Sequence, residues 1–403
     1  MDASGKGGKG ALAKLRVLDL TRVLAGPLCA MILGDMGADV LKVEQPGRGD
    51  DTRSWGPPFQ GTEAAYYLCV NRNKRGMTLN MKEPRGQEIL RELIKKSDVV
   101  IENFKFGTMA EWGCGQDFMK KEAPQAIHCT ISGYGSRGPK GAQPGYDFLL
   151  QAESGLMSIT GEKDGDPTKM GVAIVDLCTG LYAAISILGA LNARNNGHPG
   201  QHVEVSLYAT GLSLLANVAS NVLISGKAPG RYGNGHPNIV PYRSFRCRDA
   251  DIALAVGNDG QFVQFATVAG HPEWATDARF VRNRDRVGNR AVLDGLIEET
   301  LICRKADEWI EALLAVGVPC SRINTVQEAL AAAQTAATDM VIDIEHPAIG
   351  MFRSLGIPMA FSATPTEVRC PPPLLGESTD SVLREILGFS EGEIESLRAD
   401  KIV

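Results

Sequence analysis

Residues 15–44 read LRVLDLTRVLAGPLCAMILGDMGADVLKVE. The apolar runs at 15–20 and 39–44 each have the length and composition of a buried strand. Between them, residues 25–38 follow a helical pattern, with Pro27 near the first turn, where its missing N–H costs little. A strand, a helix and a second strand in this order are typical of a βαβ unit. The beginning of the chain therefore predicts an α/β fold with an open, mostly parallel sheet.

Later segments extend the same sheet. SDVVIENF at 97–104 and AIHCTISGY at 126–134 resemble further strands, and a helical pattern at 84–96 precedes the first of them. An open α/β sheet usually binds its ligand beyond the carboxyl ends of its strands. Asn103 and Phe104 are therefore candidate ligand contacts. The absence of GxGxxG weakens the alternative of an NAD enzyme.

The composition of the chain changes at SGKAPGRYGNGHPN, residues 225–238, which is typical of a linker between domains. Beyond it, a strand at 252–256 and helical patterns at about 260–269, 288–302, 305–316 and 326–336 predict a smaller α+β domain. The Gly/Lys-rich start is expected to be a disordered leader, not a targeting signal. The expected organisation is a leader at 1–14, a large domain at 15–224 and 336–403, and a small domain at 225–335.

Bulk properties exclude several classes of partner. A net charge of −5 over 403 residues argues against nucleic acid as the main partner. No apolar stretch reaches membrane-spanning length without charges or glycine, so no membrane partner is expected. Nine scattered cysteines without CxxC predict reduced thiols and a cytoplasmic location, or a mitochondrial one after removal of a leader. His198 and His202 straddle a Gly/Pro turn, so no metal site is predicted.

GVAIVDLCTG, residues 171–180, places Asp176 between an apolar run and a long apolar helical pattern. Aspartate is favoured at a helix start, where its carboxylate accepts first-turn N–H groups and the helix dipole favours the ionised form. The spacing leaves two interpretations open. Asp176 is either a helix cap alone, or a positioned carboxylate that acts as a nucleophile towards an activated acyl group.

Several short motifs occur along the chain from about residue 15 to residue 403. They are LRVLDLTRVLAGP, GADVLKVEQPGRGDDTR, NRNKR, DVVIENF, SGYG, GYD, SGLMSITG, GVAIVDLCTG, GQHVEVSL and PPPLLGESTD. Together these motifs resemble the class III CoA-transferases, the group that includes formyl-CoA and carnitine CoA-transferases. The resemblance implies a Rossmann-like large domain, a smaller domain, and an interlocked homodimer.

The resemblance implies chemical roles. Asp176 would attack a donor acyl-CoA to give a mixed anhydride and would then hold CoA as an aspartyl thioester. CoA thioesters are then substrates, and no permanently bound cofactor is expected. Gln45 and Glu111 stand where formyl-CoA transferase has arginines near the CoA phosphates, which shifts that role to other cations. The implied CoA contacts are Val23, Ala25, Leu79, Lys82, Asn103, Phe104 and Tyr146, with Arg72, Arg75 and Lys140 as further phosphate candidates.

GDDTRSWGPPF, NRNKR and GNGHPNIVPYRSF look closest to the enzymes that move CoA between dicarboxylic acids. This likeness predicts succinyl-CoA as donor and a dicarboxylate such as glutarate as acceptor. The distal carboxylate of the acceptor needs a cation or a donor set. The candidate substrate contacts are Arg22, Arg53 and His236, with Gly233, Asn234 and Gly235 as a loop over the intermediate.

Two alternatives stay open on the same resemblance. An α-methylacyl-CoA racemase needs an acid–base pair across the α-carbon. The racemases have histidine in a GHD motif, whereas this chain has Gly145-Tyr146-Asp147, and tyrosine is a poor base near neutral pH. The second alternative is a non-catalytic CoA-binding protein, which the intact Asp176 disfavours.

Overall fold

The computed structural model describes residues 9–141 and 143–403, which form two compact units. Unit 1 takes the described part of Met1–Ser154 together with Met170–Leu214 and Ala333–Val403. Unit 2 takes Gly155–Lys169 and Leu215–Ala332. The units thus divide at Leu215 and Ala332, near the proposed domain boundaries at 225 and 335, and unit 2 also includes a segment from the middle of the chain.

Unit 1 is organised around a six-stranded sheet in the order β5-β2-β1-β6-β7-β8, and every neighbouring pair is parallel. The prediction of an open parallel sheet is confirmed. The chain builds β2 and β5 on one side of β1 and then crosses to β6 on the other side. Ligands of such sheets bind where the order reverses, which is between β1 and β6. The strands are β1 (Arg16–Asp19), β2 (Asp39–Glu44), β5 (Lys74–Thr78), β6 (Val99–Glu102), β7 (Ile127–Ser132) and β8 (His202–Ser206).

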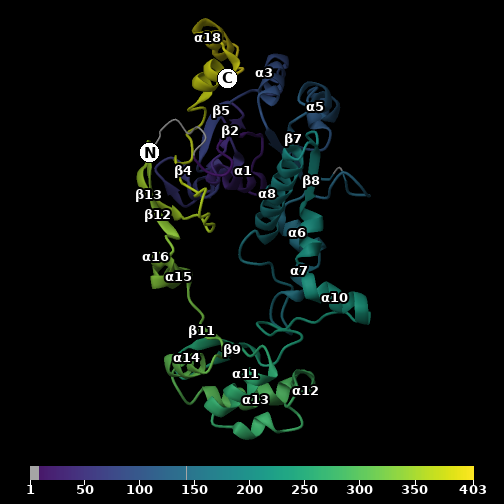
Figure 1. Ribbon diagram of the computed structural model, residues 1–403, viewed down its shortest axis with the longest axis vertical. Coiled ribbons are helices and arrows are strands. Elements are labelled where there is room, and N and C mark those ends of the chain that lie inside the picture. The colour runs from purple at the N-terminus through teal and green to yellow at the C-terminus, as the bar shows by residue number, and fades with distance from the viewer. Residues whose placement is uncertain (1–8, 142) are drawn as a thin grey trace. The chain divides into compact units, whose positions relative to one another are not determined.

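Helices cover both faces of this sheet. On one face α1 (Ala25–Asp35) and α8 (Ile174–Asn195) pack on each other, and α8 lies beside β7 and β8 (Figure 1). A Cβ at Gly180 would lie 2.6 Å from the carbonyl oxygen of Ala25, so glycine is needed for this close approach. Leu18, Leu41 and Met77 face the other layer. That layer consists of α3 (Pro84–Lys95), α5 (Gln116–Glu122), α17 (Thr379–Leu387) and α18 (Glu391–Ala399).

Unit 1 includes residues 9–14, which the sequence predicted to be part of a disordered leader. Residues 1–8 of the expected leader lie outside the described residues. Within residues 9–14, the N–H of Leu12 donates to the carbonyl of Met36 at 2.9 Å, so the chain is attached to the end of α1 before the first strand. The shorter elements of unit 1 are η1 (Asp51–Ser54), β3 (Phe59–Gln60), β4 (Glu63–Ala64), α2 (Ala65–Leu68), α4 (Thr108–Glu111), α6 (Asp147–Glu153), α9 (Leu207–Ser213), α16 (Ala333–Ala337), β12 (Val341–His346) and β13 (Gly350–Leu355).

Unit 2 contains a three-stranded antiparallel sheet in the order β11-β10-β9, and helices pack over a core that includes Phe262, Phe265 and Trp309. The predicted α+β character is confirmed. The single helix expected at 326–336 is wrong, because Ala332 is extended and divides it into α15 and α16. The elements are α7 (Leu156–Ile159), α10 (Ala216–Ser225), β9 (Tyr242–Arg246), β10 (Asp251–Ala255), α11 (Asp259–Val268), η2 (Pro272–Ala275), α12 (Asn283–Gly288), α13 (Arg290–Leu301), α14 (Ala306–Ala315), β11 (Cys320–Arg322) and α15 (Val326–Ala331).

Helix α8 has the length and apolar composition of a membrane-spanning helix. It also contains Asp176 and Arg194, and it packs against α1, β7 and β8. A core helix of an α/β unit has the same length and composition, and these contacts favour that interpretation.

Candidate active site

A cavity of about 1250 Å³ opens in unit 1 where the order of the sheet reverses. Its walls come from the loops that follow β1, β2, β6 and β7 and from the first turn of α8. Of the predicted contacts, those that line the cavity are Arg22, Val23, Ala25, Asn103, Phe104, Tyr146 and Asp176.

Asp176 is not a helix cap. Helix α8 begins at Ile174, which makes Asp176 its third residue, and the preceding Ala173 offers no side-chain cap. The cap comes from a distant carboxylate, because Asp147 Oδ1 accepts the N–H groups of Val175 at 2.8 Å and of Asp176 at 3.2 Å. Within the described residues, no hydrogen bond reaches the Asp176 carboxylate. The sequence missed Asp147, whose only signal was its position in the GYD motif.

The environment of Asp176 raises its pKa, whereas the N–H groups and dipole at a helix start would lower the pKa of a capping carboxylate. Burial, and then the negative charge of Asp147, raise the pKa of Asp176 to about 7. Tyr66 in α2 lies near the same carboxylate, and burial followed by the charge of Asp176 raises the pKa of Tyr66 to about 12. Asp176 is therefore ionised in a growing fraction of molecules as the pH rises through 7. Such a carboxylate is basic enough to be an effective nucleophile near neutral pH.

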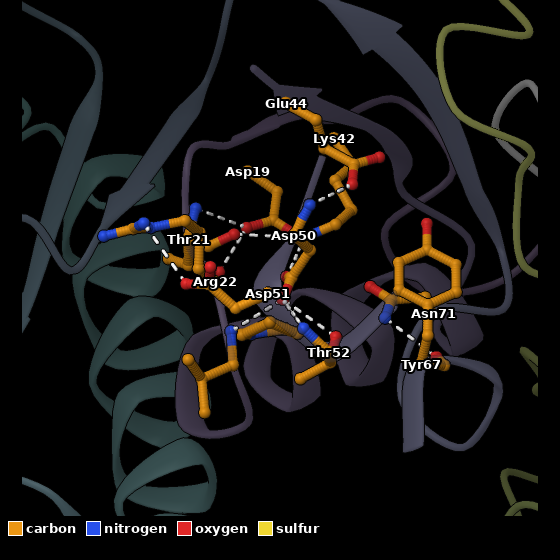
Figure 2. A network of polar contacts seen from close by, with 12 residues as sticks. Asp19, Thr21, Arg22, Lys42, Glu44, Asp50, Asp51, Thr52, Tyr67 and Asn71 are labelled. Carbon is orange, nitrogen blue, oxygen red and sulfur yellow. Dashed lines mark hydrogen bonds and ion pairs between the residues drawn. The ribbon is translucent and has the colours of Figure 1, made fainter. Parts of the chain in front are cut away.

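A buried ionic network holds the loops that form the cavity (Figure 2). Lys42 Nζ donates to Asp50 Oδ2 and to the carbonyl of Thr21, both at 3.0 Å. Asp50 Oδ1 accepts the N–H of Val23 at 3.2 Å and both the N–H and the hydroxyl of Thr52. Lys42 and Asp50 thereby join the loop after β1 to the loop after β2. Neither residue was identified from the sequence, since a lysine and an aspartate eight positions apart give no signal of burial.

The charges of this pair are stabilised by each other. Burial opposes the charge of Lys42, but Asp50, Asp19 and Glu44 outweigh it and raise the lysine's pKa. Burial likewise opposes the charge of Asp50, yet Lys42 and the donors of Thr52 lower the carboxyl pKa to about 2. Both side chains are fully buried. The loop anchor is thus an ion pair at neutral pH.

The loop after β1 has a strained backbone where it meets the cavity. Val23 has φ of +75°, a conformation that β-branched residues rarely adopt. Four hydrogen bonds from three side chains hold this loop. Lys42 donates to the carbonyl of Thr21, Asp50 accepts the N–H of Val23, and the Asn103 amide accepts the N–H of Arg22 and donates to its carbonyl. Strain of this kind persists only where the surroundings enforce it, and it is concentrated at functional sites. The amide of Asn103 is therefore engaged by the loop, although the residue lines the cavity.

Arg53 is not available to a substrate in this structure. Its guanidinium is bonded to Glu44, to the Tyr67 hydroxyl and to the carbonyl of Pro373, and its side chain is 12% exposed. Arg22 contributes to the cavity wall instead, with a side chain 53% exposed and a 3.3 Å contact to Asp51. Of the two arginines predicted to meet an acceptor carboxylate, only Arg22 is placed to do so.

The predicted phosphate-binding cations do not gather at the cavity. Arg72 pairs with Asp35 and Arg75 with Asp39, and both arginines are buried, so these cations stabilise the fold. Lys140 is exposed and pairs with Glu153. Leu79 is buried in the core and Lys82 is exposed, and neither lines the cavity. The sequence could not reveal the partners of Arg72 and Arg75, because these pairs join residues 37 and 36 positions apart.

The predicted glycine loop belongs to unit 2. Gly233 has φ of +57° and donates its N–H to Gly161, while the N–H of Gly235 bonds Tyr232. The amide of Asn234 donates to Ser244, and the ring of His236 accepts the N–H of Asn238. The N–H groups of both glycines are thus occupied within unit 2, so an oxyanion role for them needs a change in this loop.

The cavity also has a polar floor that the sequence did not predict. Thr130 Oγ1 donates to Glu102 Oε1 at 2.7 Å and lies 2.9 Å from His202 Nε2. His128 is buried beside His202, with ring centroids 4.9 Å apart. Glu102 of β6 lies opposite Thr130 of β7, and His128 of β7 lies opposite His202 of β8. Because His128 and Thr130 are two residues apart on one strand, these side chains share one face of the sheet.

Comparison with known proteins identifies a family whose model matches most of this chain. Residues 12–379 match the model of CoA-transferase family III. Succinyl-CoA:glutarate CoA-transferase of Mus musculus is 40% identical over 97% of this chain and 90% of its own length. Succinate–glutarate CoA-transferase of Agrobacterium fabrum is 41% identical over 94% of this chain and 96% of its own.

Solved structures agree with the sequence relatives. The crystal structure of a CAIB/BAIF family protein from Brucella suis is 42% identical and superposes with a TM-score of 0.82. The superposition covers 94% of this chain and 99% of the Brucella chain. The similarity thus extends over both units and is not limited to the parallel sheet.

Proposed function

The chain belongs to CoA-transferase family III and is a CoA-transferase, and on this premise we propose that it moves CoA from succinyl-CoA to glutarate or a related dicarboxylate. We further propose that Asp176 is the covalent carrier. The named activities of the mouse and Agrobacterium relatives support the choice of acids. The cytoplasmic location stays a prediction.

The proposed reaction needs only carboxylates and one thiol. An oxygen of Asp176 attacks the thioester carbonyl of the donor, the C–S bond breaks, and CoA leaves as a thiolate. The thiolate attacks the aspartyl carbonyl of the anhydride, which releases the donor acid and leaves an aspartyl-CoA thioester. The acceptor carboxylate attacks that thioester and expels CoA again. The returning thiolate attacks the acceptor acyl group, which yields the new acyl-CoA and restores Asp176.

The observation that supports this proposal most is the state of the Asp176 carboxylate. It lines a cavity at the switch point of the sheet, receives no hydrogen bond from the described residues, and has a pKa of about 7. A panel of acceptors tests the choice of acid, with succinyl-CoA as donor and formate, oxalate, glutarate and carnitine as acceptors. Glutarate is expected to give the highest kcat/KM. A clear preference for formate or carnitine would refute the dicarboxylate assignment.

Arg22 is expected to bind the distal carboxylate of the acceptor. Replacing it by alanine removes a charged hydrogen bond, so the KM for glutarate should rise roughly tenfold or more. Arg48 is a matched control, because it also pairs with Asp51 but does not line the cavity. Steady-state kinetics of Arg22→Ala and Arg48→Ala decide the matter. Equal effects of the two substitutions would assign Arg22 a role in holding Asp51 only.

The proposed partner of the chain is a second copy. Unit 1 exposes large apolar side chains on α6, α8 and α9, which is typical of a surface that another protein covers. Ile185 in the middle of α8 is 63% exposed. The other members are Phe148, Leu149, Leu181, Tyr182 and Leu212.

A graded pair of substitutions tests this homodimer. Ile185→Ala should weaken the dimer slightly, and Ile185→Asp should shift it towards monomer because a charge would be buried at the contact. Size-exclusion chromatography with light scattering over a range of protein concentrations measures both. A monomeric wild-type protein, or a dimer unaffected by Ile185→Asp, would contradict the assignment of this surface.

A further inference from the structure

Asp147, the first residue of α6, accepts three hydrogen bonds, two of which come from the first turn of α8. Its Oδ1 accepts the N–H groups of Val175 and Asp176, and its Oδ2 accepts a hydrogen bond from Gln151 Nε2 at 2.6 Å. Gln151 is buried, and its Oε1 accepts the N–H of Met170 at 2.9 Å. Asp147 and Gln151 together hold the chain that leads into α8, and with it the position of Asp176.

The same contacts direct N–H donors of the first turn of α8 away from the Asp176 carboxylate. The first N–H groups of a helix have no partner within the helix and stabilise a nearby carboxylate in its ionised form. In α8, two of these donors point at Asp147. Asp176 is therefore left with the negative charge of Asp147 close by and with no hydrogen bond among the described residues.

We propose that Asp147 is a positioning residue for the transfer reaction: it fixes the first turn of α8 and occupies that turn's N–H groups, so that Asp176 keeps an unbonded, strongly basic carboxylate. This inference rests on the proposed role of Asp176. A carboxylate that accepts hydrogen bonds is a weaker base and a weaker nucleophile than one that accepts none. A catalytic group is most effective when its pKa is near the operating pH.

Other groups around Asp176 do not replace this effect. Besides burial, the charge of Asp147 is the one electrostatic cause that raises the pKa of Asp176 among the described residues. Tyr66 approaches from α2 and stays protonated near neutral pH. Arg22 and Asp51 line the same cavity without shifting the pKa of Asp176. Asp147 is thus the residue whose removal should change the ionisation of Asp176.

The pH dependence of kcat/KM for acyl-CoA tests the proposal, because this quantity reports ionisations of the free enzyme. Wild-type activity should rise with pH through about 7, where Asp176 ionises. Asp147→Asn keeps an acceptor for the two N–H groups and removes the charge. The acidic limb of the pH profile of this variant should move to lower pH by roughly one unit, which is the size of pKa shift that a neighbouring charge causes. The plateau of kcat/KM should also be lower, because the nucleophile is less basic.

A second variant keeps the proposal testable if Asp147→Asn fails to fold. The amide introduced by Asp147→Asn would place an N–H against Gln151 Nε2, and Gln151→Glu supplies an acceptor there while still accepting from Met170. In Asp147→Asn/Gln151→Glu the carboxylate lies farther from Asp176, so the limb should still be lower than in the wild type. An unchanged limb in whichever of the two variants folds would overturn the proposal.

A separate measurement keeps the two hypotheses apart. Mass spectrometry after incubation with acyl-CoA asks whether the CoA adduct maps to Asp176 in the wild type. An adduct at Asp176 together with an unmoved limb in the variants contradicts only the role of Asp147. An adduct on another residue contradicts the proposed function itself.

Discussion

Replacing Asp176 by asparagine should lower kcat by at least about 1,000-fold, because an amide cannot form the anhydride that the proposed reaction requires. Asp176→Glu retains the carboxylate but moves it by one methylene. A displacement of about 1 Å costs on the order of 100-fold, so this variant should have intermediate activity. Steady-state transfer from succinyl-CoA to glutarate measures both, with binding of CoA as the check that the cavity is intact.

The stability of the asparagine variant separates lost chemistry from lost folding. The pKa of Asp176 in the folded protein, about 7, lies above its ordinary value of 3.8. The folded state therefore holds this proton more tightly than the unfolded chain, and ionised Asp176 destabilises the fold above pH 7. Asp176→Asn should unfold at a higher temperature than the wild type at pH 8. A variant that is inactive and also less stable at pH 8 would contradict this description of the site.

The second large effect is expected at the buried ion pair of Lys42 and Asp50. Lys42→Met removes one partner and leaves an uncompensated buried carboxylate, which costs about 3–5 kcal/mol of unfolding free energy. The double variant Lys42→Met/Asp50→Asn should recover part of that loss, because no charge then remains without a partner. Chemical denaturation followed by circular dichroism measures the three proteins.

Two controls make this prediction specific. Lys95 forms an exposed ion pair with Glu92, and Lys95→Met should leave the denaturation midpoint nearly unchanged. Because pairing lowers the pKa of Asp50 from 3.8 to about 2, its contribution is complete above pH 3.8 and is lost as the pH falls through 2. A loss for Lys42→Met no larger than for Lys95→Met would show that the pair does not anchor the loops.

Much of the fold was predictable because its signals are local. The apolar run at 39–44 forms β2 with the predicted ends, and the helical pattern at 84–96 forms α3. A capping box of Ser390 and Glu393 begins α18, and its Ser-x-x-Glu spacing is another local signal. The break at Ala332 gave no signal, since alanine is the best helix former and its extended conformation depends on tertiary structure.

The site was less predictable because its determinants are contacts between distant segments. The sequence identified Asp176, but the helix that carries it is capped by Asp147, which belongs to a distant segment. Arg53, Arg72 and Arg75 resembled free cations in the sequence, whereas Glu44, Asp35 and Asp39 neutralise them in the fold. A single sequence gives the type of a charged residue but not its partner.

The most direct test of the central claim is to trap the carrier. The protein is mixed with succinyl-CoA alone, quenched with borohydride, digested, and analysed by peptide mass spectrometry. Borohydride reduces an aspartyl thioester to an alcohol, so the peptide with Asp176 should carry that reduced side chain, and Asp176→Asn should not react. A reduced residue elsewhere, or transfer at the full rate without any modified residue, would contradict the assignment of Asp176 as the residue that carries CoA.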